Sequence, residues 1–183
     1  MFPQSNDQFL AHYGVNLESR TIYIRGEIGE RNSSHVIKWL AEFERKSLEP
    51  ITIMINSEGG DVVEGLAIVD AIELCHAPVV GIATGSCMSM ATYILAVCDK
   101  RKATRYTSFL IHNGTQTLEG TPEDNQALMK HFASVDKVCL SIYARVMKKT
   151  VKQIAKMFTG NTFFMADEAL RLGLIEEICE RVA

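Results

Sequence analysis

The sequence predicts an α/β fold with mainly parallel strands, because short apolar runs alternate with segments of helical periodicity along the chain. The chain has 183 residues, with neither internal repeats nor a linker rich in Pro, Gly or Ser. This length fits one domain around one core. We therefore expect a single α/β domain over residues 19–183. The runs with the composition of strands are residues 21–26, 51–55, 79–83 and 108–111.

Residues 1–18 are polar and weakly periodic, and we expect them to form an N-terminal arm, either axial or mobile. TIYIRG at 21–26 follows as a strand. The helix after this strand is predicted to begin with Asn32 or Ser33 as its N-cap. The apolar residues expected on one face of that helix are Val36, Leu40 and Phe43.

The middle of the chain is predicted to hold two buried strands with a helix between them. In ITIMI at 51–55 only Thr52 is polar, as in a strand covered on both faces. NSEGGD at 56–61 ends this strand and opens the helix, and Pro78 ends the helical region before the strand at 79–83. The residues that recur at helical spacing are Val62, Leu66, Val69 and Ile72.

The segment 85–97, GSCMSMATYILAV, is predicted to turn and continue as a short apolar helix, and 108–111 is the next strand. A long helix is expected over 122–149, because Thr121 caps a proline at the first helical position, where no N–H is needed. Its apolar stripe, which steps by three and four residues, is Leu128, Phe132, Val135, Cys139, Ile142 and Val146.

The C-terminal segment carries three local signals. Thr150 and Gln153 match a capping box and predict the start of a short helix. Gly173 after ADEALRL predicts the end of another helix. LIEEI at 174–178 is predicted to close the fold as an edge strand.

Charge and hydropathy argue against two classes of partner. The formal net charge is −3, so the chain lacks the basic footprint of a protein that binds nucleic acid or an anionic membrane. No apolar stretch approaches the roughly 18–20 residues of a membrane span. The N-terminus lacks the basic and apolar regions of a secretory signal, so we expect a cytoplasmic protein.

The cysteines predict no metal centre. Their number is odd, and they are scattered without the spacing of a zinc site or of a disulfide framework. We expect small apolar core residues in a reducing compartment, and neither a metal nor a cofactor. The cysteines are Cys75, Cys87, Cys98, Cys139 and Cys179.

Three chain breaks follow predicted strands, at 56–60, 84–89 and 112–114, where α/β proteins usually place their chemistry. Ser89 lies where a strand runs into an apolar helix, so its hydroxyl is either a nucleophile or a structural cap. Adjacent glycines in SEGGD either form a tight turn or let a backbone N–H face an oxyanion.

His112 is the best candidate for a base. It is the one histidine of five that the predicted elements place at the carboxyl end of a strand. The alternative is a satisfied core histidine. If the Ser89 hydroxyl needs a group to accept its proton, this imidazole is the group expected to do so.

The order and spacing of these segments resemble the proteolytic subunit of the Clp protease, the ClpP family (peptidase S14). The segments that carry the resemblance are INSEGG, GSCMSMA, FLIHN and ADEALRLGLIEEI. The similarity extends from about residue 20 to residue 178. The resemblance implies a ClpP/crotonase-like α/β fold of repeated strand–strand–helix units, with the helix 122–149 as a protruding handle.

The resemblance also implies an activity. A serine endopeptidase of this family hydrolyses unfolded polypeptides to short peptides, with Ser89 as nucleophile and His112 as base. The backbone N–H groups of Gly60 and Met90 fall on the oxyanion hole. The family assembles with itself, as stacked heptameric rings, and with an ATP-driven AAA+ unfoldase; this chain has no Walker motif of its own.

The sequence departs from the family at the third triad residue. Counting back from MADEA at 165–169, the position of the triad aspartate falls on Asn161. An aspartate fixes the imidazole tautomer and stabilises the imidazolium, whereas a neutral amide can do only part of the first task. We therefore expect a slow or conditionally active peptidase.

Other departures concern partners. The family usually has proline at the positions of Glu58 and Gly114, and glycine at that of Ala91. Aromatic residues of the unfoldase docking pocket fall on Thr52 and Met54, and an acid–Arg pair that couples the rings falls on Thr159 and Gly160. These substitutions raise the hypothesis of mixed rings with a second Clp-type subunit.

Three other functions remain as alternatives. A catalytically weak or inactive structural subunit of a Clp complex would keep the fold and lose catalysis through Asn161. A crotonase-type acyl-CoA enzyme would use the paired N–H groups but would not need Ser89 beside His112. Membrane-linked relatives with a Ser–Lys dyad are disfavoured, because Lys100 and Lys102 lie too near the serine in sequence.

Overall fold

The computed structural model of the protein describes residues 14–112, 114 and 119–180. It has the predicted α/β fold, with one mixed sheet whose main path runs β1-β2-β3-β4-β5-β8. From β2 to β8 along this path the strands are parallel, and β1 is antiparallel to β2. The strands of this path are β1 Val15–Asn16, β2 Thr21–Arg25, β3 Ile51–Ser57, β4 Val79–Met88, β5 Lys100–Thr104 and β8 Glu177–Cys179.

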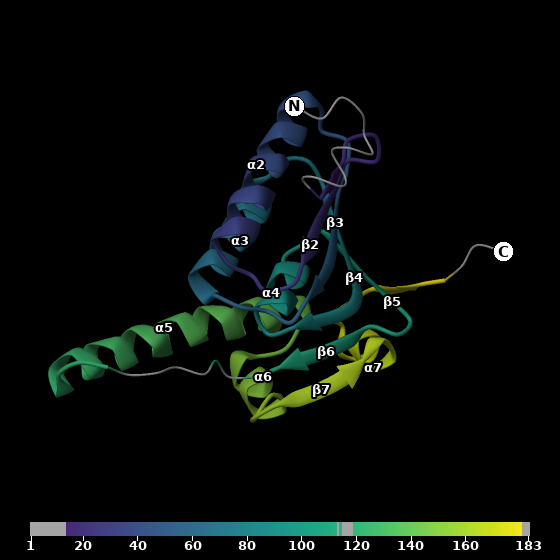
Figure 1. Cartoon of the computed structure of the whole chain (residues 1–183). Helices are drawn as coiled ribbons and strands as arrows, with labels where there is room; N and C mark the ends of the chain where they lie inside the picture. The colour runs from purple at the N-terminus through teal and green to yellow at the C-terminus, as the bar shows by residue number, and fades with distance from the viewer. Residues whose placement is uncertain (1–13, 113, 115–118, 181–183) are drawn as a thin grey trace.

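Two further strands branch from β4. β6 pairs with the end of β4 in parallel, and β7 is antiparallel to β6. Their bounds are Ser108–Ile111 for β6 and Thr162–Met165 for β7. Helices α2 and α3 lie side by side next to β2 and β3, and α5 extends from the body as a long arm (Figure 1). The helices are α2 Glu30–Lys46, α3 Val62–Leu74, α4 Met90–Ala96, α5 Pro122–Val146, α6 Val151–Met157 and α7 Ala166–Leu172.

β3 lies in the middle of the core. Ile51, Ile53 and Ile55 are completely buried, and their β-branched side chains suit a pleated surface. Thr52 and Met54, on the other face, are only half-buried in the single chain. The prediction of a strand covered on both faces was therefore wrong for this chain by itself.

β4 is longer than predicted and changes its partners. On one side β4 stays paired with β3 as far as Cys87; on the other side residues 80–83 pair with β5 and residues 86–88 pair with β6, so the predicted turn at GSC is a continuous strand. Gly85, with φ +63°, provides the bend between the two halves. The Asn56 side chain accepts a hydrogen bond from the Ser86 N–H at 3.1 Å, which holds the bend. The sequence did not predict this continuation, because the new partner strand comes from a distant segment.

The predicted start of α2 was also wrong. The helix begins at Glu30 with Gly29 as N-cap, because the Asn32 and Ser33 side chains are used elsewhere. The Asn32 amide donates to the carbonyl oxygen of Glu27, and the Ser33 hydroxyl donates to that of Glu30 at 3.1 Å. Asn32 and Ser33 therefore stabilise the first turn from within it.

Three strands escaped prediction: the short β1, which lies in the predicted arm, and β5 and β7. β5 (KRKAT) is rich in charge, and it is stabilised beside the C-terminal segment by ion pairs of Arg101 with Glu176 at 2.6 Å and of Lys102 with Glu177 at 2.7 Å. β7 (TFFM) is an edge strand that pairs only with β6 among the described residues. The last strand begins at Glu177, so the predicted 174–178 was placed three residues early.

The predicted local signals at three helix ends are confirmed. The Thr121 side chain accepts a hydrogen bond from the Asp124 N–H, and the capping box of Thr150 and Gln153 is present. Gly173 ends α7 in the left-handed conformation. The long helix α5 ends at Val146, three residues before the predicted end.

α5 has little support from its own chain over its first half. Its buried residues are Cys139, Ile142 and Tyr143, all in the second half. Met129 and Val138 are 59% and 53% exposed. Figure 1 shows the helix extending away from the sheet.

Of the predicted N-terminal arm, residues 1–13 lie outside the described residues. Val15 and Asn16 form β1, and Val15 is buried. No helix among the described residues is long and apolar enough to span a membrane.

Candidate active site

Ser89 lies at the junction of β4 and α4 in an uncommon backbone conformation, with φ 51° and ψ −124°. The turn is stabilised on both sides. The Ser89 N–H donates to the carbonyl oxygen of Leu110 in β6 at 2.8 Å, and the Ser89 carbonyl accepts from the Thr92 N–H in α4 at 3.0 Å. The Ser89 side chain forms no capping hydrogen bond, so its hydroxyl is available to other groups.

His112 follows β6 directly. β4 and β6 are parallel, with Met88 opposite Leu110, so their carboxyl ends bring Ser89 and His112 together. Nε2 of His112 lies 2.9 Å from Oγ of Ser89. Both residues are half-buried, so the pair is screened from bulk water but still accessible.

Gly60 and Met90 are the predicted oxyanion donors, and both line the cleft beside Ser89. Ile28 bonds to the residues on either side of Gly60: its N–H donates to Gly59 and its carbonyl accepts from Asp61, each at 2.8 Å. The Gly60 N–H takes no part in this bridge. The Met90 N–H is the first of α4, where no intrahelical acceptor exists.

Gly59 is required by close packing. A Cβ atom at this position would lie 2.7 Å from Cβ of Ser89 and 2.8 Å from the carbonyl oxygen of Met88, and φ is +98°. The glycine pair therefore lets the loop after β3 approach the Ser89 turn directly.

We expect Gly59→Ala to destabilise the protein more than Gly26→Ala. Both glycines have positive φ, but a Cβ at Gly26 would meet nothing within 4 Å. The difference between the variants therefore isolates the contact with Ser89. We expect a midpoint Tm lower by about 5 °C in Gly59→Ala than in Gly26→Ala, measured at one protein concentration. Equal midpoints would mean that the loop moves away at no cost.

Asn161 and His112 each lie one residue beyond the last pair of the β6–β7 ladder. β6 and β7 are antiparallel with Ile111 opposite Thr162, so a continuation of this register would oppose His112 and Asn161. Directly opposed residues point to the same face of a sheet. Among the described residues, however, no hydrogen bond joins the exposed Asn161 side chain to the imidazole. The structure thus brings together Ser89 and His112, whereas Asn161 lies one residue before β7 with no hydrogen bond to the imidazole among the described residues.

The cleft beside Ser89 has a volume of about 580 Å³ and lies between α3, α4 and α5. Its walls include side chains that the sequence prediction of the site missed. The missed lining residues that bear on chemistry are Tyr93, His131, Asp136 and Cys139. Only Cys139 among them belongs to the predicted apolar stripe of α5, where it was expected to be a core residue.

Cys139 is not a competing nucleophile. Burial, with a smaller contribution from the Asp136 carboxylate, raises the pKa of the Cys139 thiol to about 11. The thiol is therefore protonated at neutral pH, and the thiolate is the reactive form. Among residues 14–112, 114 and 119–180, no group of three His, Cys, Asp or Glu side chains is arranged to hold a metal ion.

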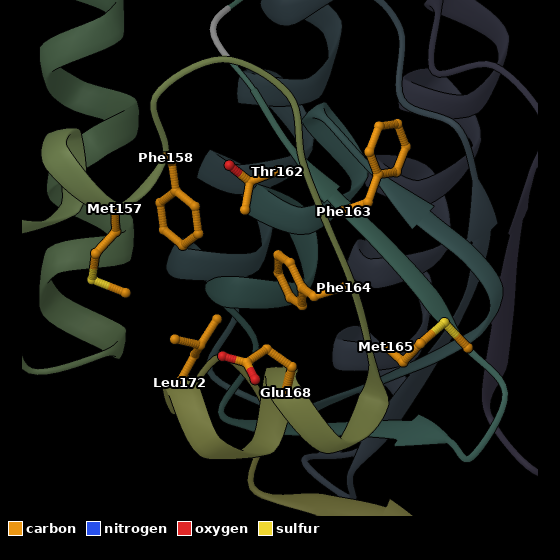
Figure 2. A pocket seen from close by; sticks show the side chains of 8 residues that line it. All are labelled: Met157, Phe158, Thr162, Phe163, Phe164, Met165, Glu168 and Leu172. Carbon is orange, nitrogen blue, oxygen red and sulfur yellow. The ribbon is translucent and has the colours of Figure 1, made fainter.

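A second hollow, of about 450 Å³, lies between α6, β7 and α7 (Figure 2). Phe158 and Phe164 face each other across it, whereas Phe163 and Met165 lie on the other side of β7. Its lining is mostly apolar and includes no serine or histidine. Glu168 at its rim is paired with Arg171. This hollow therefore lacks a nucleophile with a base.

A serine hydroxyl bonded to an imidazole, at a strand-to-helix turn beside backbone amide N–H groups, is the arrangement that defines α/β serine hydrolases. The comparisons with known proteins narrow this class. The family profile of the Clp protease matches residues 4–182. The chain therefore belongs to the Clp protease family.

Two curated relatives show the extent of the similarity. The chain is similar to "ATP-dependent Clp protease proteolytic subunit 1" of Protochlamydia amoebophila (strain UWE25), with 30% identity over 169 residues, 88% of this chain and 81% of the relative. It is also similar to "ATP-dependent Clp protease proteolytic subunit" of Carsonella ruddii (strain PV), with 26% identity over 174 residues, 94% of this chain and 90% of the relative.

Proposed function

We propose that the protein is a serine endopeptidase subunit of an ATP-dependent, self-compartmentalising protease. The observation that carries this proposal is the 2.9 Å contact between Ser89 Oγ and His112 Nε2 at the edge of the cleft. Family membership supports the same reaction. The substrates are unfolded polypeptides, which an extended cleft with apolar walls suits.

The reaction divides into acylation and deacylation. The Ser89 hydroxyl attacks the scissile carbonyl carbon while Nε2 of His112 takes the hydroxyl proton. The negative charge that develops on the carbonyl oxygen is stabilised by the N–H groups of Gly60 and Met90. The imidazolium then gives its proton to the leaving amine, and water hydrolyses the acyl-enzyme by the same steps.

The proposed partners follow from what the single chain leaves incomplete. The chain assembles with itself into rings, proposed as stacked heptamers, and the exposed apolar residues Met129 and Val138 on α5 support burial by another subunit. A AAA+ unfoldase supplies the ATP-driven step in the cytoplasm. Thr159 and Gly160, in place of the acid–Arg pair, support mixed rings with a second Clp-type subunit.

A second candidate function is a weakly active or inactive structural subunit of the same complex. The observation that favours it is Asn161, an amide that is not bonded to His112 among the described residues. A neutral amide does not stabilise the imidazolium as a carboxylate does. The two candidates differ in whether Ser89 is reactive.

Labelling with a fluorophosphonate probe distinguishes them. We expect the probe to modify the wild type at Ser89, identified by peptide mass spectrometry, and not to modify Ser89→Ala. Ser86→Ala is the matched control, because Ser86 lies near the end of β4, shortly before Ser89, and its hydroxyl has no hydrogen-bond partner among the described residues. It should label like the wild type. Absence of wild-type labelling, in a protein of native Tm, would favour the structural subunit.

A further inference from the structure

Two buried hydroxyl groups connect the handle helix α5 to the turn that carries Ser89. Thr92 lies in α4 and Tyr143 in α5, and both are 0% exposed. Oγ1 of Thr92 donates to the carbonyl oxygen of Ser89 at 2.6 Å. The same oxygen atom also contacts the hydroxyl of Tyr143.

The proton positions in this chain of hydroxyls follow from the acceptor at its end. A carbonyl oxygen only accepts, so the single hydroxyl proton of Thr92 is directed to Ser89. Because the Thr92 proton is used in this way, the Tyr143 hydroxyl is the donor in its contact with Thr92, and the Tyr93 side chain is a second hydrogen-bond partner of the same hydroxyl. Burial raises the pKa of Tyr143 well above its ordinary value, which keeps this proton in place at neutral pH. Tyr93 stacks on the Tyr143 ring, with centroids 4.4 Å apart, and limits its movement.

The carbonyl that these hydroxyls hold belongs to the same peptide unit as the Met90 N–H. A peptide unit is planar and trans, so its C=O and N–H point in opposite directions. Fixing the Ser89 carbonyl towards Thr92 therefore fixes the direction of the Met90 N–H. Such control matters here because Ser89, with φ 51° and ψ −124°, occupies a region that persists only when its surroundings hold it.

We propose that Thr92 and Tyr143 are positioning residues that orient the Met90 N–H towards the oxyanion. This inference rests on the proposed function, because it assigns a purpose to the direction of that N–H. It also makes the orientation of the donor depend on the position of α5, since Tyr143 belongs to that helix.

Kinetics on a short fluorogenic peptide test the proposal. Loss of an entire oxyanion donor costs about 10²–10³ in kcat, and a misdirected donor should cost less, about tenfold in Thr92→Val. KM should change little, because the contact forms mainly in the transition state. Thr92→Ser, which keeps the hydroxyl, should restore kcat. Tyr143→Phe, which keeps the ring, should give an intermediate loss.

Thr107→Val is the matched control. Thr107 is also 0% exposed, and its hydroxyl donates to the carbonyl of Ala83 at 3.0 Å, away from the Ser89 turn. The Thr107→Val variant should have a lower Tm, as Thr92→Val should, but an unchanged kcat. Equal kcat values in Thr92→Val and Thr107→Val would overturn the proposal. If Thr92→Val does not fold, wild-type kcat in Tyr143→Phe would overturn it.

A second measurement separates this proposal from the proposed function. The amide resonance of Met90, identified in ¹⁵N-methionine-labelled protein by its absence in Met90→Leu, reports the hydrogen-bond geometry of this peptide unit. We expect it to move in Thr92→Val and Tyr143→Phe but not in Thr107→Val. If the wild type does not react with the fluorophosphonate, the proposed function fails, and the Met90 resonance alone then tests whether Thr92 and Tyr143 orient this peptide unit. A Met90 resonance that does not move in Thr92→Val and Tyr143→Phe would overturn the proposal.

Discussion

Replacement of His112 by alanine is expected to lower peptide turnover by about 10⁶-fold, the scale on which a serine peptidase loses activity without its base. The reason is the 2.9 Å contact to Ser89, because a serine hydroxyl is a poor nucleophile until its proton is accepted. Turnover of a fluorogenic peptide and the rate of fluorophosphonate labelling should fall together. KM should change far less than kcat.

The double variant Ser89→Ala, His112→Ala sharpens this test. Residues that act as a unit are not additive, so the double variant should be no slower than either single variant. His131→Ala is the control, because this histidine lines the same cleft from α5 without a hydrogen bond to Ser89 among the described residues. It should keep nearly full turnover. A multiplicative loss in the double variant would mean that the two residues act independently.

Replacement of Asn161 by aspartate is expected to raise the acylation rate by at least about tenfold, with about 10⁴-fold as the upper limit. The β6–β7 ladder ends one residue before this pair, with Ile111 opposite Thr162, and if it continues to oppose Asn161 and His112, a carboxylate there stabilises the imidazolium and fixes its tautomer. The measurement is the single-turnover rate of acylation. An unchanged rate would mean that Asn161 is not the group that orients His112.

Thr159→Asp controls for the added charge. Thr159 is exposed and lies two residues before Asn161, outside the β6–β7 register, so it brings the same charge without the opposed position. If both variants accelerate acylation equally, the gain comes from the general field near the cleft. If only Asn161→Asp does so, the gain comes from contact with the imidazole.

Much of the candidate site could be predicted because its residues follow apolar strands. Ser89 and His112 were selected because each ends such a run, and parallel strands bring their carboxyl ends to one edge of a sheet. The helix caps at Thr121 and Thr150 were predicted correctly because their hydrogen bonds span only three residues, so the signal is local.

What escaped prediction depends on partners distant in the chain. β5 is a strand because its charged residues pair with Glu176 and Glu177, more than seventy positions away. The hydrogen bond between Tyr143 and Thr92 joins residues separated by 51 positions, and no local sequence motif marks either residue. Packing alone brings these groups together.

The sequence by itself determined the order of most strands and helices and the family of the chain, and it predicted that Asn161 occupies the position of the triad aspartate. Only the tertiary structure decided that β4 continues to Met88, that β6 replaces β5 as its neighbour over residues 86–88, and that the Ser89 carbonyl is held from α5. The physical reason is range: periodicity and caps act within a few residues, whereas strand exchange and buried hydroxyl contacts require the folded core.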